Sequence, residues 1–186
     1  VALNSAIEIQ SDVINLSWGI LQTDPPEALE CAISRAQDSG IIVVTSAGNE
    51  NAPLDTAPQW PANFSHPAFK YDNMITVGAM TYPDFNPAEE PIKASFSSFS
   101  GNVVDLAAYL TWKTPKFNAV SDEEFTFIAG TSISAPIVTG SLSGQLGPNG
   151  GSLPNWFSSN TKSSTPLLIS NQVRDGLFLP LCDDLQ

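Results

Sequence analysis

The sequence predicts an α/β fold with a mostly parallel sheet, and two strand-like segments with a helix between them support this prediction. Residues 12–18 (DVINLSW) read as a strand, and residues 41–44 (IIVV) form an uninterrupted apolar, β-branched run. Such a run is typical of a strand that is buried on both faces of a parallel sheet. Because the stretch between them has helical periodicity, the three segments form a strand–helix–strand unit.

The helix between these strands has recognisable ends. Asp24 is a candidate N-cap, Pro25 suits the first helical position, and Glu27 would complete a capping box. Apolar side chains then recur on one helical face across residues 28–36. We expect Gly40 to end the helix in the left-handed conformation.

The rest of the chain predicts two more strands and a second helix. The strands are residues 74–78 (MITVG) and 103–107 (VVDLA), and the helix runs from about residue 131 to residue 145. The glycines between residues 144 and 151 should break this helix. From residue 152 onward the tail is polar and loop-like.

Length and composition set limits on the class of protein. A chain of 186 residues with 42% apolar content is enough for one domain with a sizeable core. The net charge of −12 argues against nucleic acid and anionic lipid as partners, since both require neutralisation by Lys and Arg. No stretch approaches the roughly 18 apolar residues of a membrane span. A start at Val1 predicts a processed or trimmed chain.

The two cysteines, Cys31 and Cys182, leave the redox state open. One disulfide between them is possible, but sequence spacing cannot establish it. Cys31 falls on the apolar side of the first predicted helix, so a buried free thiol is an alternative of at least equal weight. No cluster of Cys and His has the spacing of a zinc site.

The most informative stretch is residues 130–136 (GTSISAP), a small-residue turn that opens into the second helix. At such a bend, Ser132 can present its hydroxyl to a substrate while the helix dipole faces the reaction. A helix-capping serine is the alternative, and a lone GTS favours that alternative.

Four ordered segments resemble the subtilisin-like serine proteases (subtilases, peptidase S8). They are residues 13–19 (VINLSWG), 43–50 (VVTSAGNE), 94–98 (ASFSS) with 104–106 (VDL), and 130–136. The match is clear over residues 13–140 and weak over 141–186, so residues 1–186 look like the C-terminal portion of one catalytic domain. The resemblance implies a three-layer α/β/α fold whose N-terminal part is missing from this chain. It also implies a serine endopeptidase that works through an acyl-enzyme.

The resemblance further implies roles for individual residues. Ser132 would be the nucleophile, and the Asn49 amide would donate to the oxyanion; an ordinary Gly-Asn turn is the alternative for Asn49. Substrate would bind as an added strand between two segments, namely Ser17, Trp18 and Gly19 on one side and Ser46, Ala47 and Gly48 on the other. Trp18 stands where the family often has Leu, and would either fill core or enlarge the pocket wall. Gln59 replaces a glycine at the pocket base, which predicts a shallower or more polar pocket.

The catalytic His and Asp of the family lie upstream of its matching segments. The only histidine of this chain, His66, reads as an ordinary loop residue. We therefore expect a complementary N-terminal segment or chain to carry both residues, and this chain alone to be close to inactive. The apolar edge beside Val13 would otherwise invite aggregation. The alternatives are a noncatalytic pseudoprotease or peptide-binding scaffold, and another acyl hydrolase, which no GxSxG elbow supports.

The remaining expectations concern cofactors, modification and compartment. The chemistry needs no cofactor, but structural calcium is common in the family, and the loops at residues 60–72 and 82–90 offer oxygen ligands. Asn63 begins an NFS glycosylation pattern. Because the family is mostly exported, an extracellular location is expected.

Overall fold

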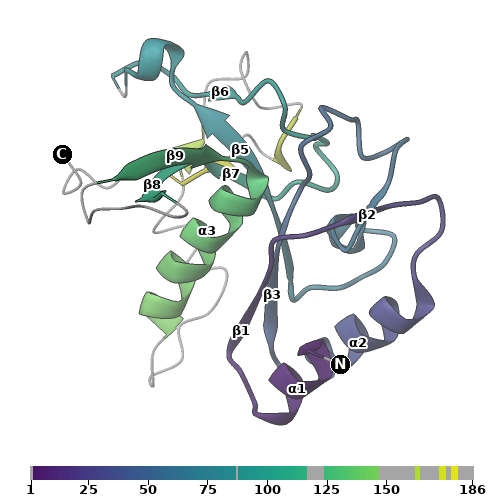
Figure 1. Cartoon of the computed structure of the whole chain (residues 1–186). Helices are drawn as coiled ribbons and strands as arrows, with labels where there is room; N and C mark the ends of the chain where they lie inside the picture. The colour runs from purple at the N-terminus through teal and green to yellow at the C-terminus, as the bar shows by residue number, and fades with distance from the viewer. Residues whose placement is uncertain are drawn as a thin grey trace.

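The structure is a computed structural model that describes residues 2–86, 88–116, 124–146, 162–163, 172–174 and 177–179 (Figure 1). Its centre is a sheet in which β1 (Val13–Leu16), β3 (Ile42–Ser46), β5 (Met74–Thr81), β7 (Leu106–Tyr109) and β11 (Leu177–Phe178) pair in that order, all parallel. The sheet continues into β10 (Lys162–Ser163), which is antiparallel to β11, and β6 (Ile92–Lys93) pairs antiparallel with β5. This confirms the predicted α/β class.

Helices cover both faces of the sheet. On one face α3 (Thr131–Leu146) lies across β1, β3, β5 and β7, while α2 (Glu27–Asp38) packs on the other face with α1 (Ala2–Glu8) against it (Figure 1). Val43 packs into the α2 side and Val44 into the α3 side, and neither is exposed. The apolar run at residues 41–44 therefore serves both faces, as the sequence predicts.

Several predicted boundaries need correction. The α2 helix begins at Glu27 after Pro26, with no side-chain cap, so the capping box that begins at Asp24 is wrong. The strand predicted at residues 103–107 begins instead at Leu106, because the preceding residues turn and Val104 N–H donates to Ser100 O. Gly40 does have a left-handed φ of 72°, and the helix ends there as expected.

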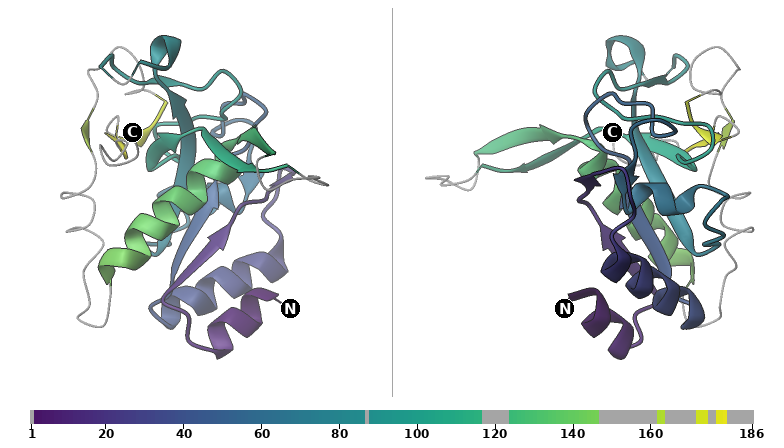
Figure 2. Two further views of the ribbon diagram at one scale, coloured as in Figure 1. Left: turned by 60° about the vertical axis from the view of Figure 1, so that its left-hand side comes forward. Right: turned by 90° about the vertical axis from the view of Figure 1, so that its right-hand side faces the viewer.

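A projecting hairpin is the main element that the sequence did not predict. Strands β8 (Thr111–Pro115) and β9 (Phe125–Ala129) pair with each other and extend away from the body just before α3 begins (Figure 2). Four of its large apolar side chains are exposed, namely Trp112, Phe125, Phe127 and Ile128. A second small pair joins β2 (Ile20–Leu21) to β4 (Gln59–Trp60), which is followed by the short helix η1 (Ala62–Ser65).

Two side chains differ from their sequence-based expectations. Cys31 is exposed on α2, so the buried-thiol alternative is wrong, and Cys182 lies outside the described residues. Asn63 is buried in η1, where its amide donates to Leu54 O and accepts from Gln59 N–H. Because this amide is buried and its nitrogen is bonded to Leu54 O, Asn63 is not accessible as a glycan acceptor in the folded chain.

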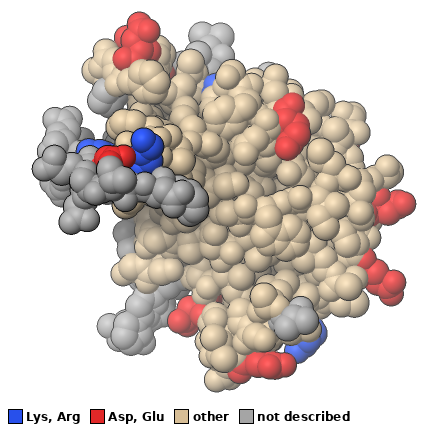
Figure 3. All heavy atoms as spheres, viewed as in Figure 1, with Lys and Arg blue, Asp and Glu red and all other residues tan. Residues whose placement is uncertain are grey.

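The acidic side chains are spread over the surface and do not gather in one patch. Figure 3 shows acidic side chains scattered over the visible face, separated by uncharged surface. The acidic residues 122–123 and 183–184 lie outside the described residues, as does the glycine-rich stretch after α3. Among the described residues, no helix is long and apolar enough to cross a lipid bilayer.

Candidate functional site

The candidate site lies at the carboxyl ends of the sheet strands, where three elements meet. Parallel strands β1 and β3 end side by side, with Leu16 paired to Thr45, and the chain then enters the two predicted substrate-binding segments. The Thr45 hydroxyl also donates to Leu16 O at 3.1 Å, which ties the two ends together. The N-terminus of α3 lies at the same end of the sheet, because Thr131 bonds to residues that follow β3 and Ser132 bonds to Ser17 after β1. Carboxyl ends of parallel strands are where α/β proteins place ligand sites.

Ser132 occupies the second position of α3 and is half-buried. Its hydroxyl donates to Ser17 O at 3.2 Å, and the Ser17 hydroxyl donates back to Ser132 O at 3.0 Å. This reciprocal pair fixes the first turn of α3 against the end of β1. The Ser132 oxygen is thus held at the boundary of the site and is not packed into the core.

Asn49 follows β3 and is exposed, but one side of its amide is firmly held. Its Oδ1 accepts from the Thr131 N–H at 2.9 Å and from the Thr131 hydroxyl at 3.0 Å. The same hydroxyl accepts from Gly48 N–H at 3.1 Å. With Oδ1 occupied in this way, the Nδ2 group of Asn49 is oriented away from Thr131 and is available as a donor.

Thr131 is therefore a positioning residue to which the sequence reasoning gave no role. Its hydroxyl is fully buried and bridges the end of β3 to the start of α3. The only sequence signal for this role was its place between Gly130 and Ser132.

Gln59 fills the space between the two predicted substrate-binding segments. A Cβ atom added at Gly19 or at Gly48 would overlap the Gln59 side chain, so this side chain lies against both glycines. Gly48 also has a φ of 101°, which favours glycine for a second reason. The Gln59 amide faces acceptors, so its nitrogen is assigned to that side, where Nε2 donates to Glu50 Oε2 at 3.0 Å and to Ala47 O at 3.1 Å. Glu50 is a polar neighbour that the sequence reasoning missed.

The two segments differ in exposure. Trp18 is 46% exposed and Gly19 is exposed as well, so the alternative in which Trp18 fills core is wrong. Ser46, Ala47 and Gly48 are buried, and Ser98 N–H donates to Gly48 O at 3.0 Å. The first segment therefore offers accessible main chain, whereas the second forms a wall.

The histidine of the chain lies apart from this arrangement. His66 follows η1, and its Nδ1 accepts from the Ala68 N–H at 3.1 Å. This local bond is what an ordinary loop histidine makes, in agreement with the sequence-based interpretation.

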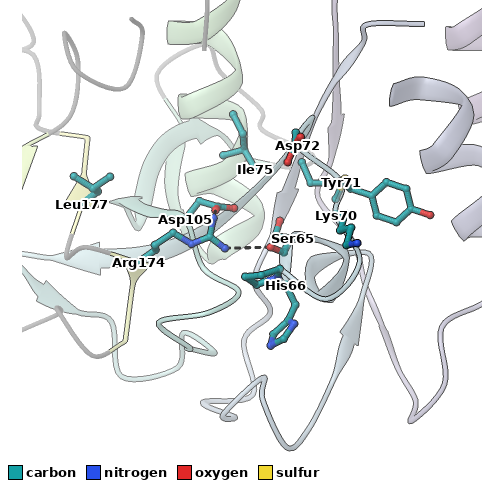
Figure 4. Close-up of a pocket in the computed structure, with 11 residues that line it drawn as sticks. Ser65, His66, Lys70, Tyr71, Asp72, Ile75, Asp105, Arg174 and Leu177 are labelled. Carbon is teal, nitrogen blue, oxygen red and sulfur yellow. Dashed lines mark hydrogen bonds and ion pairs between the residues drawn. The ribbon is translucent and has the colours of Figure 1, made fainter. Parts of the chain in front are cut away.

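A cavity of about 830 Å³ opens on a different part of the molecule (Figure 4). Asp105 lies in its wall, pairs with the Arg174 guanidinium at 2.6 Å, and accepts from Thr76 N–H at 2.8 Å. Burial raises the pKa of the Asp105 carboxyl to about 6, although Arg174 and the Thr76 bond lower it. Because Asp105 and Arg174 are paired with each other and none of the predicted site residues lines this cavity, we do not assign the chemistry to it.

Metal binding finds no support among the described side chains. Within the described part of the chain, no group of three or more His, Cys, Asp or Glu side chains could hold a metal ion. The described side chains therefore do not support the expected calcium site in the loops at residues 60–72 and 82–90.

Comparison with known proteins places this arrangement in context. The model of the subtilase family matches residues 1–146. Thermitase of Thermoactinomyces vulgaris is 33% identical over 143 residues, which make up 77% of this chain and 43% of that protein. The extracellular serine proteinase of Thermus sp. (strain Rt41A) is 31% identical over 175 residues, or 89% of this chain and 36% of that protein. The chain thus spans about two fifths of the length of these curated relatives.

Solved structures show the same fold. A cold adapted subtilisin-like serine proteinase superposes with a TM-score of 0.68 at 25% identity, covering 97% of this chain and 60% of that one. The epidermin leader peptide processing serine protease of Staphylococcus aureus gives a TM-score of 0.67 at 21% identity over 96% of this chain and 51% of its own. The architecture around the two strand ends and α3 is therefore a known one.

Proposed function

This chain belongs to the subtilase family, and from that premise we propose that it supplies the nucleophile and the oxyanion donor of a serine endopeptidase. The observation that supports this most is the convergence of Ser132 and Asn49 at one sheet edge. Thr131 bonds to Asn49, and Ser132 bonds to Ser17, so neighbouring residues of α3 hold both strand ends.

In this proposal the reaction follows from the positions of these groups. A base removes the proton of the Ser132 hydroxyl as its oxygen attacks the peptide carbonyl. The carbonyl oxygen becomes negative and accepts from the Nδ2 group of Asn49, which costs little reorganisation because Thr131 already orients the amide. The amine then leaves with a proton, and water hydrolyses the resulting ester on Ser132.

The polypeptide substrate would bind as an extended strand along residues 17–19. This segment is accessible, and main-chain pairing of this kind is a common mode of peptide recognition. The Gly48 N–H and carbonyl are already bonded to Thr131 and Ser98, so residues 46–48 would form a side wall of the substrate groove.

The base and its orienting acid would come from a complementary segment or chain that carries His and Asp. His66 makes its own loop bond and does not join Ser132, so it leaves this role open. Among the described residues β1 pairs only with β3, so its other edge is free to pair with such a segment. This chain alone should then show little activity.

We also propose an exported location for the protein. The Thermus relative is named as extracellular, whereas a Bacillus subtilis relative, 30% identical over 145 residues, is named as intracellular. Detection of the protein in culture medium, with a cytoplasmic marker retained in the cells, would support export.

Labelling with a serine-directed fluorophosphonate tests the proposed activity. In the complete protein, with the complementary segment present, the adduct should form on Ser132 and disappear in Ser132→Ala. The matched control is Ser143→Ala, which removes an exposed hydroxyl from the same helix and should not affect labelling. If the complete, folded protein binds peptides but does not label, the noncatalytic peptide-binding alternative is favoured.

A further inference from the structure

We infer that Gln59 limits the substrate residue before the scissile bond to a small side chain, namely Gly, Ala or Ser. This inference rests on the proposed function, since it names the substrate class of the same groove. It depends on the space between residues 17–19 and 46–48, where the side chain of that substrate residue would enter.

That space is already occupied by the protein itself. The Gln59 side chain touches the positions that a Cβ would take at Gly19 and at Gly48 on opposite walls. A glycine on each wall would ordinarily leave room for a ligand, but here this room is filled by the amide. A substrate methyl group can lie at the entrance, whereas an aromatic ring would have to displace the glutamine.

Gln59 is held in place from several directions. With the amide nitrogen assigned to the side of Glu50 and Ala47, Nε2 donates to Glu50 Oε2 and Ala47 O. The backbone N–H of Gln59 donates to Asn63 Oδ1. It also pairs with Leu21 in the small β2–β4 sheet and is only 6% exposed. Moving its side chain would leave a buried amide unsatisfied, so the closed pocket is the stable arrangement.

The charge of Glu50 does not change this conclusion. Its carboxylate is exposed and accepts from Gln59, and the Ser98 hydroxyl donates to it at 3.4 Å. A substrate Lys could be attracted to this carboxylate, but its aliphatic stem would meet the same obstruction. We therefore favour small side chains over basic ones, and the experiment includes both.

Peptides that differ only in one residue test the inference. In the complete protein, tetrapeptide substrates with Ala, Lys or Phe before the scissile bond should show kcat/KM higher for Ala than for Phe or Lys by about tenfold or more. Gln59→Ala should raise the Phe-to-Ala ratio by about tenfold, because it opens the space between Gly19 and Gly48. Gln59→Met retains the volume and should stay closed to Phe.

The control variant is Gln37→Ala on α2, which should not alter the ratio. A wild-type preference for Phe or Lys, or an unchanged ratio in Gln59→Ala, would overturn the inference even if Ser132 labels normally. Binding of the corresponding product peptides to Ser132→Ala protein measures the same discrimination without catalysis. If labelling fails, tighter binding of the Ala peptide that is lost in Gln59→Ala would still support the closed pocket, and equal binding would overturn it.

Discussion

At the scale of single residues, the site depends on one buried hydroxyl that holds an exposed amide. The Thr131 hydroxyl donates to Asn49 and accepts from Gly48, so it uses both hydrogen-bonding capacities within the site. Asn49 is therefore oriented before any substrate arrives, which is the condition under which a donor lowers a reaction barrier most.

Replacement of Asn49 by Ala should reduce kcat strongly in the complete protein. In the proposed role its amide donates to the oxygen that becomes negative in the transition state, so we expect a loss of about 10²–10³ in kcat, or about 2.7–4 kcal/mol, with KM little changed. Steady-state kinetics on a peptide substrate measure this. Asn86→Ala, in an exposed loop, is the control; a fall of kcat below about threefold in Asn49→Ala would contradict the assigned role.

Thr131→Val should have a smaller effect of the same kind. The substitution keeps the shape but removes the hydroxyl, so Asn49 loses one of two anchors and Gly48 N–H loses its acceptor. We expect kcat to fall by about tenfold and the free energy of unfolding to fall by about 1–3 kcal/mol. Thr131→Ser restores the hydroxyl and should recover most of both losses, whereas a purely steric role would give the opposite order.

At the scale of elements, a short C-terminal segment is joined to the sheet by an ion pair and main-chain bonds. Arg174 N–H donates to Val104 O at 2.7 Å, and Leu179 N–H donates to Ala107 O at 2.9 Å, which places β11 beside β7. The Arg174 guanidinium meets the buried Asp105 carboxylate at 2.6 Å and donates to Ser65 O. Removing one partner of such a pair leaves a buried charge without compensation.

Arg174→Ala should therefore destabilise the protein most at neutral pH. The folded-state pKa of Asp105, about 6, lies above its usual value of 3.8, so the folded state holds this proton more tightly and stability from this group falls as pH rises through that window. Loss of Arg174 raises the pKa further. We expect a loss of about 3 kcal/mol at pH 7.5, the low end of the range for such pairs because Arg174 is 37% exposed, and a smaller loss at pH 5, where Asp105 is protonated.

Denaturant unfolding of wild type and Arg174→Ala at both pH values measures this difference. Lys70→Ala removes an exposed positive charge from the wall of the same cavity and serves as the control. An equal loss at pH 5 and pH 7.5 would show that the ionised Asp105 is not what Arg174 compensates.

At the scale of the whole molecule, the sequence predicted buried segments better than exposed segments. The strand at residues 41–44 was predicted because burial on both faces leaves a continuous apolar run in the sequence. The helix predicted at residues 131–145 corresponds to α3. The capping box at Asp24 failed because the chain enters α2 through Pro26 in an extended conformation, which local composition does not determine. The β8–β9 hairpin has exposed apolar side chains, so its pattern does not alternate as a half-buried strand should.

The candidate site was only partly predictable for a related reason. Ser132 and Asn49 lie in segments whose sequences resemble those of the subtilases, and the structure brings both residues to the carboxyl ends of β1 and β3. The position of the Gln59 side chain depends on the pairing of β2 with β4 and on contact with glycines 40 and 11 residues earlier in the chain, at positions 19 and 48. Contacts between segments so far apart leave no periodic signal in a single sequence.

Two opposing features of the whole surface govern how copies of this chain meet. The exposed hairpin favours apolar association, while a net charge of −12 makes copies repel each other. Salt screens the repulsion and leaves the apolar attraction, so we expect self-association at pH 7.5 to increase with ionic strength.

Phe127→Glu should reduce this self-association without changing the free energy of unfolding, since Phe127 is 71% exposed on the hairpin. Phe85→Glu is the matched control, because Phe85 is 70% exposed elsewhere. Light scattering on size-exclusion fractions measures the mass of the species, and equal effects of the two variants would show that charge alone, and not the hairpin, controls association.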